Sequence, residues 1–108
     1  MNTIFILIDT LRRDHLGCYG NDWIQTPHFD ALAQKSVVFD QAYLGSYPCM
    51  PARRDMWTGS FEFPWRGWGP LEPSDPDIAK IVTQNGHTSM VISDHYHMWE
   101  RGSGNYFF

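Results

Sequence analysis

Three places in the sequence carry side chains that could do chemistry. Cys49 is followed four residues later by Arg53, the segment from Asp94 to His97 holds one carboxylate and two imidazoles, and Asp9 ends an apolar run. A thiol can act as a nucleophile, an imidazole can move a proton, and a carboxylate is a hard oxygen ligand for a divalent cation. The same residue types also have ordinary structural uses, since Cys packs as a small apolar residue and Asp commonly caps a turn after a strand.

Alternating strands and helices are predicted to position these side chains. Three apolar, β-branched runs have the composition of strands, namely Thr3–Ile8, Ser36–Tyr43 and Thr88–Ile92. Three segments have helical spacing with start or stop residues, namely Thr26–Lys35, Met50–Trp57 and Asp77–Gln84. The segment from Ser60 to Pro76, which is rich in proline, glycine and tryptophan, predicts a long irregular connection.

The order of these elements predicts an α/β fold with a mostly parallel sheet flanked by helices. Ligands of such sheets bind outside the carboxyl ends of the strands, so Asp9 and the segment after Ile92 are expected on one rim. His95 and His97 are alternate residues, which point the same way on an extended segment. Because Pro51 is tolerated only in a first helical turn, Cys49 is expected at a helix amino terminus.

The cysteines are better suited to chemistry than to a disulfide. Cys18 and Cys49 are the two cysteines of the 108-residue chain, and nothing in the flanking sequence indicates secretion. The apolar run from Ile4 to Ile8 is too short for a signal-peptide core or a membrane span. We therefore expect a cytoplasmic protein without a membrane partner, in which a cysteine is used chemically.

The charge pattern excludes a general nucleic-acid binder. The formal net charge is −4, and the arginines at 12–13 and 53–54 form isolated pairs, not a basic stripe. A hydrophobic content of 43% is enough for a packed core. We expect four tryptophans to pack or to line a pocket, where an aromatic wall could select a hydrophobic leaving group; they are Trp57, Trp65, Trp68 and Trp99.

The segment around Cys49 resembles the signature of the sulfatase family, which is Cys or Ser, any residue, Pro, any residue, Arg, then four residues and Thr-Gly. Cys49, Pro51, Arg53 and Thr58-Gly59 meet every fixed position. Upstream, IFILIDTLRRDHLGCYGN looks like the family's opening strand with its metal-binding Asp, and TPHFDALAQKSVVFDQAY looks like its Thr-Pro helix and following strand. The resemblance implies an alkaline phosphatase-like fold, with residues 1–108 as the amino-terminal part of a sulfatase-like catalytic domain.

The resemblance also implies a reaction. Cys49 would be oxidised to formylglycine by a formylglycine-generating enzyme that reads the run from Cys49 to Arg53. The hydrated aldehyde would attack the sulfur of a small-molecule sulfate ester and expel the alcohol, and its second hydroxyl would then collapse to release sulfate. The expected activity is that of a sulfuric ester hydrolase. The chain by itself is expected to be inactive, because further metal ligands would come from the rest of the catalytic chain.

The roles of the remaining residues follow from the same resemblance. Arg53 would be the electrostatic partner of the residue 49 alkoxide, and Asp9 together with hydrated residue 49 would bind a divalent metal. Calcium is the expected metal, with magnesium or manganese as alternatives. His95 or His97 would bond substrate oxygen or protonate the leaving group. Thr58 and Gly59 are expected to close the helix.

Two departures from the family pattern keep other functions open. Asp9 is followed by Thr10 where many sulfatases have a second Asp, and residues 94–97 read Asp-His-Tyr-His where sulfatases often have Lys-Trp-His. Asp94 then stands as a substrate-binding candidate beside the two histidines, without a sulfate-gripping Lys. One alternative is a phosphonate monoester or phosphodiester hydrolase that uses the same residue 49. Another is a noncatalytic, truncated binding module.

Overall fold

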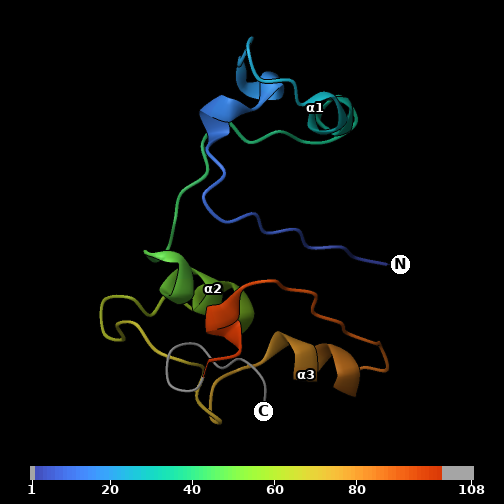
Figure 1. Ribbon diagram of the computed structural model, residues 1–108. Helices are drawn as coiled ribbons and strands as arrows, with labels where there is room; N and C mark the ends of the chain where they lie inside the picture. Colours follow the sequence, from blue (N-terminus) through green and yellow to red (C-terminus); the bar gives the residue numbers. More distant parts are fainter. Residues whose placement is uncertain (1, 101–108) are drawn as a thin grey trace. The chain divides into compact units, whose positions relative to one another are not determined.

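The computed structural model describes residues 2–100, and Figure 1 shows them as short helices joined by long connections. The chain divides into two compact units, Met1–Ala42 and Tyr43–Phe108. The α-helices are α1 (Pro27–Ala33), α2 (Cys49–Thr58) and α3 (Ile78–Gln84). Three short 3₁₀ helices are η1 (Arg13–His15), η2 (Gly17–Tyr19) and η3 (Tyr96–Met98). No helix in the described part of the chain is long and apolar enough to cross a membrane.

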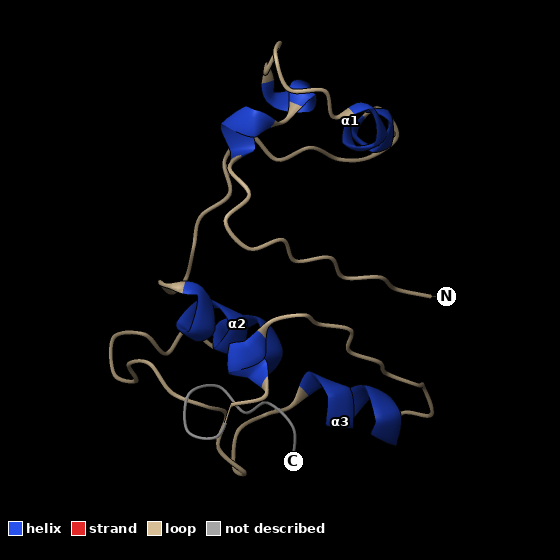
Figure 2. Cartoon of the chain, in the orientation of Figure 1, coloured by secondary structure: helices blue, strands red, loops and turns tan. Residues whose placement is uncertain are grey.

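The predicted mostly parallel sheet is wrong for these residues. Figure 2 shows helices and loops, and no strand is present between residues 2 and 100. The apolar runs 3–8, 36–43 and 88–92 lie outside every helix. Most of their side chains are exposed, with Ile4 84% and Ile92 90% accessible, and Val91 alone among them is partly buried against the core. A parallel strand needs neighbouring strands for its backbone hydrogen bonds and helices over both faces. Local apolar composition indicates burial but cannot supply those partners.

In the first unit, α1 begins as predicted with Pro27 at its first position and ends two residues before the predicted Lys35. It packs against η2 through polar contacts. Thr26 Oγ1 accepts a hydrogen bond from the Gly17 N–H at 2.8 Å, and Asp30 Oδ1 accepts one from the Cys18 N–H at 2.7 Å. A Cβ atom on residue 17 would lie 2.5 Å from the Asp30 carboxylate, so a larger residue there would displace that carboxylate from its hydrogen bonds.

In the second unit, α2 begins at Cys49, one residue before the predicted start, which confirms that Cys49 stands at a helix amino terminus. The helix ends at Gly59, whose φ of +74° lies in the left-handed region and whose N–H donates to the Asp55 carbonyl at 2.8 Å. Thr58 Oγ1 donates to the Arg54 carbonyl and accepts from the Ser60 N–H. The prediction that Thr58 and Gly59 close the helix is therefore confirmed.

The small core of the second unit lies under α2. Met50, Leu71 and Met98 are buried together, so η3 and the connection after α2 both pack on the first turn of that helix. Cys49 borders this cluster. The packing therefore fixes the backbone directly after Cys49 and directly after His97, where Met50 and Met98 stand.

The helix α3 confirms the helix predicted over Asp77–Gln84, with Asp77 as its N-cap. The Asp77 carboxylate accepts hydrogen bonds from the Ala79 N–H at 2.8 Å and from the Trp57 indole N–H at 2.9 Å. One carboxylate therefore caps α3 and ties it to α2. Gly86, with a φ of +79°, follows the end of α3, as the predicted Asn85-Gly86 stop requires.

Candidate functional site

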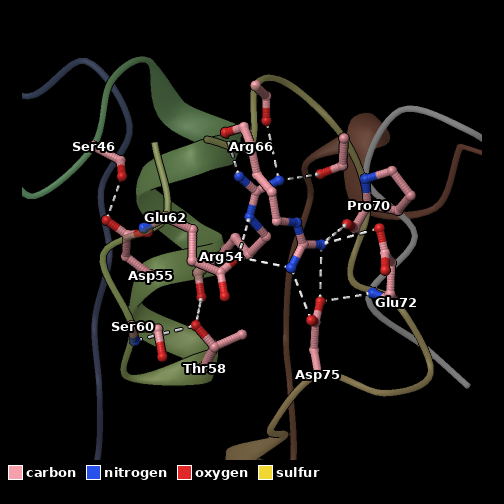
Figure 3. A network of polar contacts seen from close by, with 12 residues as sticks. Ser46, Arg54, Asp55, Thr58, Ser60, Glu62, Arg66, Pro70, Glu72 and Asp75 are labelled. Atoms are coloured by element: carbon pink, nitrogen blue, oxygen red, sulfur yellow. Dashed lines mark hydrogen bonds and ion pairs between the residues drawn. The ribbon is translucent and has the colours of Figure 1, made fainter. Parts of the chain in front are cut away.

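The candidate nucleophile is a free, half-buried thiol at the first residue of α2. The free N–H groups of the first helical turn favour negative charge, so a thiolate or an alkoxide at position 49 would be stabilised there. The preceding segment is anchored below it, because the buried Ser46 hydroxyl hydrogen-bonds the buried carboxylate of Asp55 (Figure 3). This hydrogen bond holds the residues that precede Cys49 against α2, the helix that begins at Cys49.

Arg53 stands one helical turn after Cys49. Residues four apart lie on the same face of an α-helix, so the guanidinium and the thiol share a face of α2. Arg53 is only 9% exposed, and its Nη1 approaches the sulfur of Met50 at 4.0 Å. A buried guanidinium keeps its charge, which makes it a fixed positive group beside residue 49.

The two histidines lie together, although not on the extended segment that was predicted. His95 is the N-cap of η3 and His97 lies within this 3₁₀ turn. Their ring centroids are 5.0 Å apart, and both rings are half-buried. A ring nitrogen of His95 and the Cys49 sulfur lie within 4.8 Å of each other. The second unit therefore brings Cys49, His95 and His97 into one cluster.

The two carboxylates singled out in the sequence are both exposed. Asp94 precedes His95 but its side chain is exposed. Asp9 is exposed too and belongs to the unit Met1–Ala42, whereas Cys49 belongs to Tyr43–Phe108. Metal binding by Asp9 and substrate binding by Asp94 stay predictions.

A metal ion at residue 49 would find suitable donors only after that residue changes. A thiol and an imidazole suit softer ions, whereas calcium, magnesium and manganese prefer oxygen ligands. Conversion of the Cys49 side chain to a hydrated aldehyde would replace the sulfur with oxygen donors at the same place. A hard cation at position 49 would therefore need oxygen donors that the unmodified thiol does not offer.

Sequence reasoning missed Arg54, which is 1% exposed. Figure 3 shows its guanidinium in a network with Glu62, at 3.4 Å, and with the connection that follows α2. The network continues to Arg66, which bonds Glu62 at 2.7 Å and Asp75 at 2.8 Å. This bonding to Arg66 lowers the pKa of Asp75 from its ordinary value. The available sequence signal was a second arginine directly after Arg53, in front of a connection that contains acidic residues.

Comparisons with known proteins agree with the motif. The sequence model of the family described as Sulfatase matches residues 1–108. Arylsulfatase D of Homo sapiens is 30% identical over 115 residues, covering 94% of the chain and 19% of that relative. N-acetylgalactosamine-6-O-sulfatase of Bacteroides thetaiotaomicron is 42% identical over 113 residues, covering 95% of the chain and 21% of that relative.

A further relative is the steryl-sulfatase of Mus musculus, which is 30% identical over 106 residues, covering 84% of the chain and 17% of that relative. The chain spans about a fifth of the length of these curated relatives. No solved structure matches it. The match over residues 1–108, together with the complete signature from Cys49 to Gly59, shows that the chain belongs to the sulfatase family.

Proposed function

We propose that the full-length protein hydrolyses sulfate esters, with residue 49 as its nucleophile. The observation that carries the proposal is the position of Cys49 within the sulfatase signature. It is the first residue of α2, one turn before the buried Arg53 and within 4.8 Å of the His95 ring. The helix amino terminus and the guanidinium both stabilise negative charge where an attacking oxygen would stand.

In the proposed reaction, a formylglycine-generating enzyme first oxidises the Cys49 side chain to an aldehyde with an external oxidant that it supplies, and the sulfur leaves as sulfide. The aldehyde then takes up water. One hydroxyl oxygen of residue 49 then forms a bond to sulfur while the bond between sulfur and the alcohol oxygen breaks. The second hydroxyl gives up its proton, its C–O bond becomes C=O, and sulfate leaves with the oxygen that attacked. Arg53 holds the attacking oxygen in its charged form.

We assign the proton for the leaving alcohol to His97. Its Nδ1 is buried and has no hydrogen-bond partner among the described residues. A buried ring nitrogen without a protein partner is available to a group of the substrate. As an imidazolium, His97 would give one ring proton to the leaving alcohol oxygen and end as the neutral ring, and the neighbouring His95 would bond an oxygen of the sulfate group.

The proposal includes a divalent metal, for which Asp9 and the oxygens of residue 49 are the proposed ligands in this chain. Calcium is the proposed ion, with magnesium or manganese as alternatives, since all three prefer the oxygen donors that these residues would offer. When bound, the ion would favour the alkoxide form of residue 49 and neutralise charge on the sulfate group. Further ligands would come from the rest of the catalytic chain.

The test begins with the mass of the peptide that contains residue 49, isolated from full-length protein made in a host with the modifying enzyme. Conversion of the thiol to the aldehyde lowers the mass by about 18 Da, because an oxygen replaces the sulfur and two hydrogens are lost. We expect the modified protein to hydrolyse an aryl sulfate and Cys49→Ala to lose that activity. Cys18→Ala is the matched control and should keep it.

Two results would contradict the proposal. A preference of about a hundredfold for a phosphonate monoester or a phosphate diester over the sulfate ester would assign the protein to phosphorus chemistry at the same residue; such a factor corresponds to about 2.7 kcal/mol in transition-state binding. A thiol that stays unmodified in a competent host, with no turnover of any ester, would indicate a noncatalytic binding module.

A further inference from the structure

Trp68 lies against the histidine cluster from a different part of the chain. Its ring meets the His97 ring edge to face, with centroids 5.9 Å apart and an interplanar angle of 82°. The Trp68 side chain is nevertheless 47% exposed, so much of the indole stays open to solvent. A half-open indole beside a reactive imidazole can stack on a flat molecule that approaches that imidazole.

The backbone around Trp68 is held by Arg54. The Arg54 Nη1 donates to the carbonyl of Gly67 at 3.1 Å and to that of Gly69 at 3.4 Å, on both sides of Trp68. Its Nη2 donates to the Arg66 carbonyl at 2.8 Å. Because α2 carries both Cys49 and Arg54, these bonds tie the position of Trp68 to the helix that carries the nucleophile.

A second arginine, Arg66, joins residues before and after Trp68 within the connection that follows α2. The Arg66 guanidinium bonds Glu62 at 2.7 Å, Asp75 at 2.8 Å and 3.0 Å, and the Pro70 carbonyl at 3.4 Å (Figure 3). The residues on both sides of Trp68 are therefore cross-linked by charge-assisted hydrogen bonds. An irregular segment with so many fixed carbonyls can present one side chain in a defined place.

We propose that Trp68 is a specificity-determining residue that stacks on the flat face of a ring in the leaving alcohol, and that Arg54 is its positioning residue. The inference rests on the proposed function, in which His97 gives its proton to the alcohol oxygen. The alcohol part of the ester then lies next to the His97 ring, where the indole of Trp68 is its neighbour. Aromatic rings and the C–H face of a sugar ring both offer the flat apolar surface that an indole binds.

The test compares substrates with and without a ring in the full-length protein. The value of kcat/KM is measured for 4-nitrophenyl sulfate, a hexose 6-sulfate and a small acyclic alkyl sulfate. We expect Trp68→Ala to lower the ratio of ring-bearing to acyclic substrate about tenfold or more, and Trp68→Phe to keep most of it. Whichever ring substrate shows the larger loss identifies the ring as aryl or sugar.

Trp65→Ala is the matched control, because Trp65 lies on the same connection and is 77% exposed. It should leave the ratio unchanged. Equal losses of kcat/KM for ring-bearing and acyclic substrates in Trp68→Ala would overturn the inference while leaving sulfate hydrolysis intact. So would an equal change of the ratio in Trp65→Ala.

A binding measurement separates this inference from the proposed reaction. In a Cys49→Ala background, which cannot turn over, the Kd of phenyl sulfate is measured by calorimetry with Trp68 and with Trp68→Ala. A weaker Kd, by about tenfold, supports stacking even if no ester is hydrolysed by the parent protein. An unchanged Kd overturns the role of Trp68.

The positioning role of Arg54 is tested with Arg54→Lys, which keeps the charge but cannot bond three carbonyls in one plane. We expect the ratio of ring-bearing to acyclic kcat/KM to fall as in Trp68→Ala, mainly through KM for the ring substrate. The double variant with Trp68→Ala should show no further loss in this ratio. Independent, multiplied losses would contradict an action of Arg54 through Trp68, and so would a ratio that Arg54→Lys leaves unchanged.

Discussion

The units Met1–Ala42 and Tyr43–Phe108 differ in where their side chains find partners. In the first unit every described side chain is at least partly accessible, and its ion pairs, such as Arg12 with Asp14, are exposed. In the second unit a helix buries both apolar and charged residues, among them Met50 and Arg54. The candidate residues on α2 and η3 are thus held by packing, whereas Asp9 stands on an exposed run. Of the proposed site, the part near Cys49 is the better prepared for chemistry.

The largest expected effect on the free energy of unfolding comes from removing the buried guanidinium of Arg54. Arg54→Ala leaves the carbonyls of residues 66, 67 and 69 and the Glu62 carboxylate without their partner. Loss of one member of a buried ion pair costs about 3–5 kcal/mol. We expect a corresponding drop in the free energy of unfolding, measured by urea denaturation. Arg12→Ala, which breaks an exposed pair in the first unit, should cause no measurable change. Equal effects of the two changes would remove the contrast between the units.

An apolar pair of substitutions tests the same contrast without charge. Met50→Ala empties a site that is 0% exposed in the core, and such changes cost about 2–5 kcal/mol. Leu32→Ala is the matched change on α1, where the side chain is 60% exposed, and it should alter the unfolding free energy by less than about 0.5 kcal/mol. Thermal unfolding of both variants measures the difference. A costly Leu32→Ala would mean that α1 is buried in the full-length protein.

The smallest expected effect is a dependence on pH. The hydrogen bond from Arg66 lowers the pKa of Asp75 below the value of about 3.9 that a free Asp has. Since the folded pKa is the lower one, its contribution to stability is complete above about pH 4 and is lost as the pH falls through the folded pKa.

The check compares the urea midpoint of the parent with that of Asp75→Asn between pH 3 and pH 7. The difference between the two should shrink below about pH 4. Asp14 is the matched control: the hydrogen bond from Arg12 also lowers its pKa, but solvent screens this exposed pair. Asp14→Asn should therefore show no such difference. A constant gap for Asp75→Asn at all pH values would contradict the ion-pair explanation.

Local signals in the sequence predicted the helices correctly. They could not predict whether strands would pair, because strand pairing depends on distant residues. Pro27, Asp77 and Gly59 act within one turn of the helix end that they mark, which is why α1, α2 and α3 begin and end within two residues of the prediction. A strand depends on partners that can lie anywhere in a chain, so runs such as Thr3–Ile8 gave a sheet that residues 2–100 do not form.

The candidate site shows the same division. The spacing of Cys49 and Arg53 on one helix face was predictable, because it needs only the period of the helix. The contact between the His97 and Trp68 rings joins residues 29 positions apart in sequence, and no local pattern indicates it. Arg54 was also missed, since its partners are mostly backbone carbonyls, which any residue type carries.

Because α2 ends at Gly59, the spacing of residues in the family signature also sets the length of this helix. Nine steps of helix separate Cys49 from Thr58, and each step turns the chain by about 100°. One residue inserted between Arg53 and Thr58 would swing everything that follows, including the connection with Trp68, to another side of the helix axis. The fixed number of residues between Arg53 and Thr58-Gly59 therefore determines the direction in which the chain leaves the helix that carries the nucleophile.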